Sequence, residues 1–299
     1  MKAQGALEYL ILIAAVLAIA AVVVLFITST GGSSASSAAL SACKEAAGSC
    51  SLLLMNGPNS CSQCDTACVG SSGKEILPDA VHMCKLGKQG SIVEQSGLVL
   101  LLHFDEGSGN TAIDSSGKDN NGVINGSTAY ETGKVGTALR FNGTVNKNVE
   151  INNVAIPTAT GTKFTVEFWM KGNTYNAAPI AFGGIALYGT DCFGFNTNGG
   201  QRKGIQDAAT ALGNSWHYVS AIFSNTYTSQ SELYIDGVKY PLPASPTCGP
   251  DLAAAQASPR MTVGSGWYGT YPFNGLIDEV RVYSRALTAE EIQSHYRNF

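Results

Sequence analysis

An uncharged apolar run near the start of the chain limits what this sequence can become more than any other feature. The run extends from Tyr9 to Ile27 as YLILIAAVLAIAAVVVLFI, and Glu8 stands directly before it. A helix of this length, about 28 Å at 1.5 Å per residue, matches the hydrocarbon thickness of a bilayer. Because the run is apolar on every side, it predicts a membrane span or a helix packed among copies of itself.

Two ordinary interpretations of this segment each leave a feature unexplained. A cleaved secretory signal has a basic first region, a shorter apolar stretch and a cleavage site after that stretch, whereas Lys2 is the one basic residue here. A simple membrane anchor accounts for the run but gives no reason for Glu8, since a carboxylate at a bilayer is costly and indicates a function. A third interpretation accounts for both features.

The N-terminal sequence MKAQGALEYL resembles the archaeal class III signal peptide of type IV pilin-like proteins. The matching residues are Gln4, Gly5, Leu7, Glu8, Tyr9 and Leu10. The resemblance implies that a prepilin peptidase removes a leader peptide, residues 1–3, between Ala3 and Gln4, and leaves residues 4–30 as a hydrophobic helix. It also implies that Glu8 meets the freed amino group of a neighbouring pilin subunit, because opposite charges stabilise each other strongly in a low-dielectric bundle. We therefore expect a cell-surface protein, anchored in the membrane or assembled into a filament.

Residues 31–95 are predicted to form a Ser/Gly linker followed by a Cys-rich spacer. Residues 28–42 are rich in Ser, Gly and Ala, which is typical of a flexible connector or a frayed helix end. The six cysteines that follow are Cys43, Cys50, Cys61, Cys64, Cys68 and Cys84. In an exported protein they predict disulfides, with the pairing left open. The spacing Cys61-x2-Cys64-x3-Cys68 keeps a zinc or iron–sulfur site as the alternative.

Residues 96–299 contain short segments in which apolar and polar side chains alternate with period two, as in half-buried strands. The predicted strands cover 98–104, 138–143, 149–154, 164–171, 216–223, 231–240 and 276–283. Asp236-Gly237 predicts a tight hairpin turn. A Thr288-Ala-Glu-Glu291 capping box begins a predicted helix over 287–298. The chain is therefore expected to be mainly β, with a two-sheet antiparallel sandwich of the jelly-roll type.

The same region resembles the laminin-G-like, concanavalin-A-like jelly rolls. The matching segments are HFDEGSGNTAIDSSG (103–117), NNG (120–122), GTALRFNG (136–143), FTVEFWMK (164–171), NSWHYVSAIF (214–223), ELYIDGV (232–238) and GLIDEVRVYSRALTAEEI (275–292). The resemblance implies two packed antiparallel sheets that often bind glycans or proteins. It covers essentially all of residues 96–299.

Charge and motifs argue against two classes of function. Charged residues make up 13% of the chain and no cluster of Lys and Arg occurs, so a nucleic-acid partner is not expected. Glycoside hydrolases of this fold place two carboxylates on one strand in a Glu-x-Asp-x-x-Glu pattern, which is absent here. Glu167 stands alone in its strand, and alternation sends Asp278 and Glu279 to opposite faces. The sequence therefore predicts no enzyme.

A structural calcium ion that joins the first and last strands is the one cofactor that the resemblance implies. Asp278, in the pattern Ile-Asp-x-Val-Arg-Val, would be one ligand, and Asp105 or Glu106 would supply the other side. Asp114 and Asn121 are weaker candidates. The alternative is that these side chains cap turns and accept backbone hydrogen bonds, as Asp and Asn in loops often do.

Aromatic residues supply the candidate ligand contacts. Trp169 and Trp216 lie in alternating strands and are predicted to be core residues. Trp267, Tyr268 and Tyr271 lie in the Gly-rich segment GSGWYGTYPFNG, where an exposed ring could stack on a sugar. Packing of these rings within their own loop is the alternative.

Two cysteines and two sequons remain in the C-terminal region. Cys192 and Cys248 are predicted to pair, since the other six cysteines cluster far upstream. Asn125-Gly-Ser and Asn142-Gly-Thr are acceptor sequences for N-linked glycans.

Taken together, these features predict a cell-surface pilin-like protein that presents a laminin-G-like module for adhesion to glycans, cells or surfaces. Its expected partners are other pilin subunits, prepilin peptidase, the membrane and an extracellular glycan or surface protein. The first alternative is a monomeric, membrane-anchored binding or structural protein. The second is an extracellular glycoside hydrolase.

Overall fold

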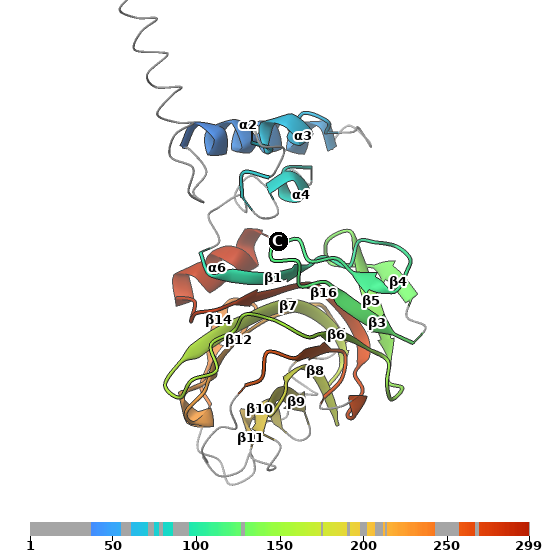
Figure 1. Cartoon of the computed structure of the whole chain (residues 1–299), viewed down its shortest axis with the longest axis vertical. Helices are drawn as coiled ribbons and strands as arrows, with labels where there is room; N and C mark the ends of the chain where they lie inside the picture. Colours follow the sequence, from blue (N-terminus) through green and yellow to red (C-terminus); the bar gives the residue numbers. More distant parts are fainter. Residues whose placement is uncertain are drawn as a thin grey trace, which may run out of the picture. The chain divides into compact units, whose positions relative to one another are not determined.

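The chain divides into two units, Met1–Glu94 and Gln95–Phe299 (Figure 1). The computed structural model describes residues 37–54, 61–70, 75–77, 80–85, 96–126, 129–174, 176–189, 192–197, 202–206, 212, 214–242, 257–266 and 269–298. The predicted leader and hydrophobic helix, residues 1–30, lie outside this set. None of the helices in the described ranges has the length and hydropathy needed to cross a bilayer.

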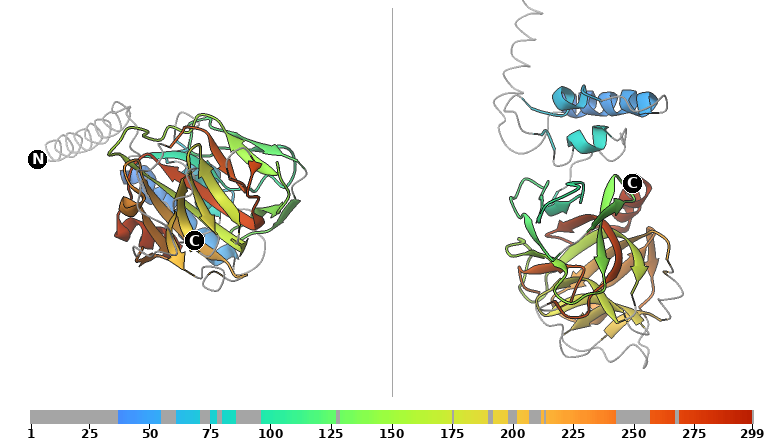
Figure 2. Two further views of the ribbon diagram at one scale, coloured as in Figure 1. Left: turned by 90° about the horizontal axis from the view of Figure 1, so that it is seen from below. Right: turned by 90° about the vertical axis from the view of Figure 1, so that its right-hand side faces the viewer.

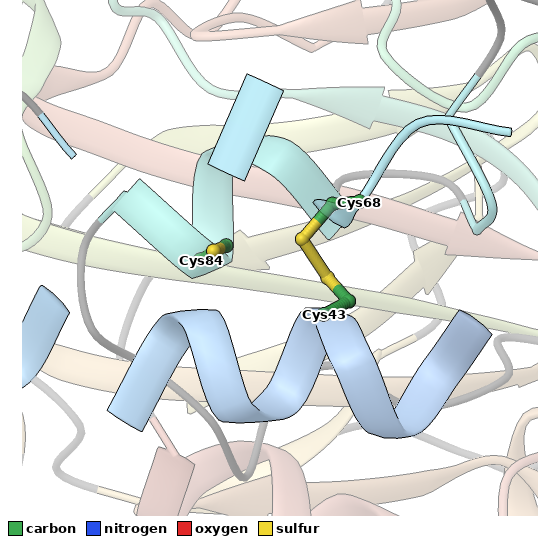
Figure 3. A group of neighbouring side chains, drawn as sticks. All are labelled: Cys43, Cys68 and Cys84. Carbon is green, nitrogen blue, oxygen red and sulfur yellow. A yellow bond between two sulfur atoms is a disulfide. The ribbon is translucent and has the colours of Figure 1, made fainter. Parts of the chain in front are cut away.

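Three disulfides join the short helices of the first unit, α2 (Ser37–Leu54), α3 (Cys64–Ala67) and α4 (Ala80–Lys85). The pairs are Cys43–Cys68, Cys50–Cys61 and Cys64–Cys84. Figure 3 shows the first of these bonds, with Cys84 of α4 close to it. The predicted disulfides are thus confirmed with one defined pairing, and these six sulfurs are not available as metal-binding thiolates.

The predicted connector is shorter than expected, because α2 already begins at Ser37. The segment SAALSA at 37–42 is rich in Ala, which has the highest intrinsic helix propensity. Cys43 and Cys50 then lie seven residues apart on this helix, so both sulfurs lie on the same side of it, toward the rest of the unit.

Two antiparallel sheets form the second unit and confirm the predicted sandwich (Figures 1 and 2). In spatial order the first sheet contains β14 (Val238–Tyr240), β13 (Glu232–Ile235), β12 (His217–Ser224), β7 (Lys163–Asn173), β16 (Asn274–Tyr283), β5 (Thr137–Asn142) and β4 (Ala129–Thr132), and β1 (Leu98–Leu102) also pairs with β16. The second sheet contains β11 (Arg202–Gln206), β10 (Cys192–Thr197), β9 (Ile185–Gly189), β8 (Ala177–Phe182), β15 (Met261–Val263), β6 (Asn148–Ile151), β3 (Gly122–Asn125) and β2 (Thr111–Ala112).

Strand β7 shows how alternation builds the core between the sheets. Phe164, Val166, Phe168 and Met170 are spaced two residues apart, and all four are buried in the main apolar cluster. The Phe164 ring meets Phe182 of β8 edge to face, with ring centroids 5.0 Å apart. The residues between them on β7 face away from this core, and they supply the outer surface on which the C-terminal helix packs.

The C-terminal helix α6 (Ala289–Asn298) begins at the predicted capping box. The Glu291 backbone N–H donates to Thr288 Oγ1 at 3.2 Å, and the Thr288 N–H donates to Glu291 Oε2 at 2.8 Å. Ile292 then packs in a second, outer apolar cluster with Leu98, Leu101, Ile222, Tyr234, Tyr283 and Leu287. The predicted hairpin is also present, with φ of 52° at Asp236 and 75° at Gly237 in the β13–β14 turn.

Replacing Glu291 by Ala should lower the free energy of unfolding of the sandwich by about 1 kcal/mol, because it removes the cap and the ion pair with Arg285. Hydrogen bonding to the Arg285 guanidinium lowers the pKa of Glu291 from 4.5 to about 2. A lowered carboxyl pKa stabilises the fold fully above pH 4.5, and this contribution disappears as the pH falls toward 2.

Unfolding of the whole chain followed by tryptophan fluorescence measures this effect, since Trp169, Trp216 and Trp267 all lie in the second unit. Glu290→Ala is the matched control, because Glu290 is exposed in the same helical turn. Equal stability of the two variants at pH 6 would contradict the assigned role of Glu291.

Candidate functional site

Five segments of the second unit surround a pocket of about 370 Å³ on the outer side of the first sheet. Its lining residues are Lys134, Trp169, Trp216, Asp236, Tyr296 and Arg297. They come from the loop after β4, from β7, from the residue before β12, from the β13–β14 turn and from the end of α6. A concave site with aromatic walls and a few charged groups has the features of a small-ligand site.

The aromatic wall of the pocket is built on Trp169 of β7. Because Phe168 and Met170 face the core, Trp169 between them faces outward. Its ring centroid lies 5.2 Å from that of Tyr218 on β12 and 5.9 Å from that of Tyr296 on α6. These aromatic contacts hold the wall in place and join two strands to the helix.

The prediction that Trp169 is a buried residue is confirmed, whereas the same prediction for Trp216 is wrong. Trp169 is 3% exposed, but it lies outside the core cluster between the sheets. Trp216 is half-buried and lines the pocket. It directly precedes β12, whose first residue is His217, so strand alternation does not direct its side chain into the core.

A buried carboxylate fixes the loop that carries Lys134. Asp278 Oδ2 accepts hydrogen bonds from the backbone N–H groups of Lys134 and Val135, at 2.7 and 3.0 Å. The Gly133 N–H donates to Gly136 C=O at 3.1 Å and closes the loop on itself. The Lys134 Nζ then lies 4.3 Å from the centroid of the Trp169 ring, within the range of a cation–π contact.

The opposite side of the pocket is formed by Asp236 in the β13–β14 turn. Asp236 Oδ1 accepts the Tyr218 N–H at 2.9 Å, and Oδ2 lies 2.8 Å from His217 Nδ1. Gly237, next in the turn, packs against Tyr296, since an added Cβ would lie 3.0 Å from Tyr296 Cδ1. The hairpin turn therefore positions both the carboxylate and one aromatic ring.

Behind the pocket, ionisable side chains are buried between the first sheet and α6. His295 Nδ1 of α6 lies 2.7 Å from Glu167 Oε2 on β7. On the neighbouring strand, Glu279 contacts His103 Nδ1 at 2.7 Å and accepts from Arg281 Nη2 at 2.8 Å. Glu167, Glu279 and Arg281 are each 0–1% exposed. Pairing of this kind offsets the cost of burying their charges.

Glu167 is the one carboxylate of its strand, as expected, but the expectation that Asp278 and Glu279 face opposite sides is wrong. The register of β16 against β7 shifts between Asp278 and Arg281, and Glu279 has φ of 52°. This bulge interrupts the alternation. Asp278 pairs in register with the outward-facing Trp169, while Glu279 contacts Arg281, which lies opposite the outward-facing Glu167. Burial, followed by the charge of Glu279, raises the pKa of Asp278 from 3.8 to about 8.

The predicted calcium ligands act mainly as hydrogen-bond acceptors for turns. Asp105 Oδ1 accepts the Thr137 N–H at 2.6 Å. Glu106 accepts from the Ile113 N–H at 2.7 Å and from the Tyr130 hydroxyl at 3.2 Å. The weaker candidates also bond to each other, because the Asp114 N–H donates to Asn121 Oδ1 at 2.8 Å.

The described residues of this region provide part of a ligand set for calcium. Asp278 Oδ1 is buried and has no hydrogen-bond partner among the described residues, which suits a metal ligand. Asp105 lies close enough for its charge to raise the pKa of Asp278. Glu106 is turned toward Tyr130 instead. Within the described part of the chain, no three carboxylate or imidazole ligand atoms converge on one point. Calcium binding through Asp278 and Asp105 therefore stays a prediction.

Comparison with known protein families identifies the sandwich. Residues 142–293 match the family described as the concanavalin A-like lectin/glucanases superfamily. The chain belongs to this superfamily. Residues 2–27 match the class III signal peptide, which confirms the predicted class of this signal peptide. The protein is therefore located at the cell surface or outside the cell and is anchored to the membrane.

Solved structures that are similar to part of this chain include a domain of an enzyme and the binding domains of toxins. Domain 4 of AbnA, a GH43 extracellular arabinanase from Geobacillus stearothermophilus, in complex with arabinotriose, is 22% identical, with a TM-score of 0.48 and coverage of 67% of this chain and 98% of that one. The botulinum neurotoxin serotype D ligand-binding domain in complex with N-acetylneuraminic acid is 16% identical, with a TM-score of 0.47 and coverage of 67% and 50%. This chain thus spans about half of that toxin structure. No curated protein sequence matched the chain.

Of the aromatic residues predicted to contact a ligand, Tyr271 is described and is not among the residues that line the pocket. Tyr271 is 39% exposed, and its ring meets Tyr188 of β9 edge to face at 4.9 Å. Trp267 and Tyr268 lie outside the described residues. The sequence does contain an indication of this site. Trp169 and Glu167 occupy the outward positions of β7, and a tryptophan and a carboxylate there indicate that another element packs over this face.

The structure describes three of the remaining four predicted site residues, namely Cys192, Asn125 and Asn142. Cys192 is disulfide-bonded, and Cys248, its predicted partner, lies outside the described residues. The Asn142 side chain is exposed, whereas Asn125 Nδ2 donates to the buried Asn148 Oδ1 at 3.0 Å. Asn142 is thus the more accessible of the two predicted glycan acceptors.

Replacing Asp278 by Ala should destabilise the sandwich by about 2 kcal/mol, because it leaves two backbone N–H groups of the Lys134 loop without their acceptor. Asp278→Asn retains an acceptor oxygen, so it should destabilise the sandwich less than Asp278→Ala does. Thermal unfolding followed by tryptophan fluorescence measures both variants. A wild-type midpoint that rises with calcium and falls with a chelator, but is insensitive in Asp278→Asn, would support a calcium site. A loss in Asp278→Asn as large as in Asp278→Ala would contradict the capping role.

Proposed function

We propose that this protein is a pilin-like surface adhesin whose sandwich binds glycans in the pocket formed by Trp169, Trp216 and Tyr296. The pocket carries the proposal. It combines aromatic faces, on which a sugar ring can lie, with charged groups that can bond to hydroxyls. Its volume of about 370 Å³ lies at the lower end of the range for small-ligand sites.

The rigidity of the pocket supports binding. The Trp169 ring contacts both Tyr218 and Tyr296, and Asp236 is held by His217 and a backbone N–H. Side chains that are already ordered lose little conformational entropy when a ligand binds. A preformed site of this kind suits repeated, reversible attachment to a surface.

The positions of the carboxylates favour binding over hydrolysis. A glycosidase of the usual type needs two carboxyl groups facing one cleft. Asp236 is the single carboxylate among the described residues that line the pocket. Glu167 and Glu279 are fully buried behind the pocket and engage His295, His103 and Arg281. These positions support the expectation that the protein is not an enzyme.

Replacing Trp216 by Ala should weaken glycan binding by up to about 10-fold, because contact with one aromatic face is worth about 0.5–1.5 kcal/mol beyond the area it buries. A glycan array probed with the full chain in detergent measures this. Tyr271→Ala is the matched control, since Tyr271 is an exposed aromatic outside the pocket. Loss of binding in Tyr271→Ala with normal binding in Trp216→Ala would move the site to the Gly-rich loop.

The pilin part of the proposal rests on the class III signal peptide at residues 2–27. A mature chain that begins at Gln4 is expected, and mass spectrometry of the protein from cells measures it. Glu8→Ala should leave processing intact but reduce assembly, because the partner charge for the freed amino group is lost.

Electron microscopy of filaments labelled with an antibody to the sandwich tests the assembly step, with Glu45→Ala on the exposed side of α2 as the control. Label confined to the membrane in the wild type would favour the monomeric anchored protein instead. A mature chain that begins after Ile27 would contradict both the filament and the membrane-anchored monomer, because it would lack the hydrophobic helix.

A further inference from the structure

The positively and negatively charged groups that line the pocket differ in number, and they differ in whether they are already bonded within the protein. Among the lining residues that the structure describes, Lys134 and Arg297 supply two cations, whereas Asp236 supplies the one carboxylate. Both oxygens of Asp236 are occupied, by the Tyr218 N–H and by His217 Nδ1. No ion pair joins Lys134 or Arg297 to a carboxylate of the described residues. Among the described residues, the charges open to a ligand in the pocket are therefore positive.

This positive charge is local, because the protein as a whole carries a net charge of −4. General attraction of the chain for anions therefore cannot explain a preference for an acidic ligand. Such a preference would have to come from the two cations of the pocket.

Lys134 is positioned for a ligand before one arrives. Asp278 holds the backbone of its loop at two N–H groups, and Gly133 sits so close to the Asp278 carboxylate that an added Cβ would lie 2.6 Å from Oδ2. The Lys134 side chain is exposed yet lies over the Trp169 ring. An ammonium group in this position can pair with an anion while remaining beside an aromatic face.

Arg297 supplies the second cation from the last turn of α6, next to Tyr296. Its planar guanidinium can donate two parallel hydrogen bonds to one carboxylate. Aromatic faces and cations are thus found in the same small cavity. A sugar ring that bears a carboxylate matches both at once.

We propose that the pocket selects sugars that carry a carboxylate, such as uronic acids, over their neutral counterparts. This inference rests on the proposed glycan binding and names the class of sugar. Trp216 and Tyr296 would contact the ring, and Lys134 and Arg297 would bind the carboxylate. Asp278 acts on this selectivity only through the loop that it holds.

The test uses an array of uronic-acid polysaccharides, each printed both in its native form and after chemical reduction of its carboxyl groups to alcohols. Sulfated polysaccharides without uronic acid are included. The full chain in detergent should bind native forms about 10-fold more tightly than reduced forms, as expected for one charge-assisted hydrogen bond. The preference should decrease in high salt, because the cations are exposed.

Lys134→Met should lower the ratio of native to reduced binding, because only Arg297 is then left to bind the carboxylate, whereas the Asp278 contacts to the loop backbone are unchanged. Lys118→Met is the matched control, since Lys118 is exposed and lies outside the pocket. Unfolding followed by tryptophan fluorescence confirms that both variants fold.

Equal binding of native and reduced forms would overturn the selectivity and leave the proposed glycan binding intact, as would binding of sulfated forms alone. An unchanged ratio in folded Lys134→Met would overturn the role of the lysine. Binding to no glycan at all would overturn both this inference and the proposed function.

Discussion

The two faces of strand β7 determine most of what this sandwich can do. Along one face Phe164, Val166, Phe168 and Met170 enter the core between the sheets. Along the other, Glu167 and Trp169 face away from that core and require cover. Because side chains alternate along a strand, the residues that stabilise the sandwich also fix the positions of the outward pair. The pocket and the buried charge cluster both follow from this constraint.

Helix α6 provides the cover, and its contacts match the pattern beneath it. Ile292 packs over the apolar end of the outer face, His295 pairs with Glu167, and Tyr296 meets Trp169. Apolar, charged and aromatic contacts are thus made by one short helix that the capping box starts at a defined residue. A change in the start of α6 would therefore alter the pocket wall as well as the stability of the fold.

The sequence predicted the strands of the first sheet far better than those of the second. Segments such as 164–171 and 216–223 alternate clearly because one side faces the core and the other carries polar groups. Strands β8, β9 and β10 are buried at every position and contain Ala and Gly on their outer side, so they show no alternation. Periodicity alone cannot detect such strands.

The candidate site was predicted less well than the fold, for two physical reasons. The pocket combines segments distant in sequence, from Lys134 to Arg297, so no local motif marks it. The bulge at Glu279 also reverses the expected direction of a side chain, and bulges follow from packing rather than from strand propensity. The class III signal peptide, in contrast, is a local pattern, and it was predicted from its own residues.

The three tryptophans give the most direct view of where a ligand binds. Two of them, Trp169 and Trp216, line the pocket, and Trp267 belongs to the Gly-rich segment GSGWYGTYPFNG. The decisive measurement is a titration of the full chain, labelled with ¹⁵N at the tryptophan indoles, with a glycan that it binds. Shifts of the Trp216 and Trp169 indole resonances, with Trp267 unchanged, are the predicted result. A shift confined to Trp267 would contradict the assignment of the pocket as the binding site.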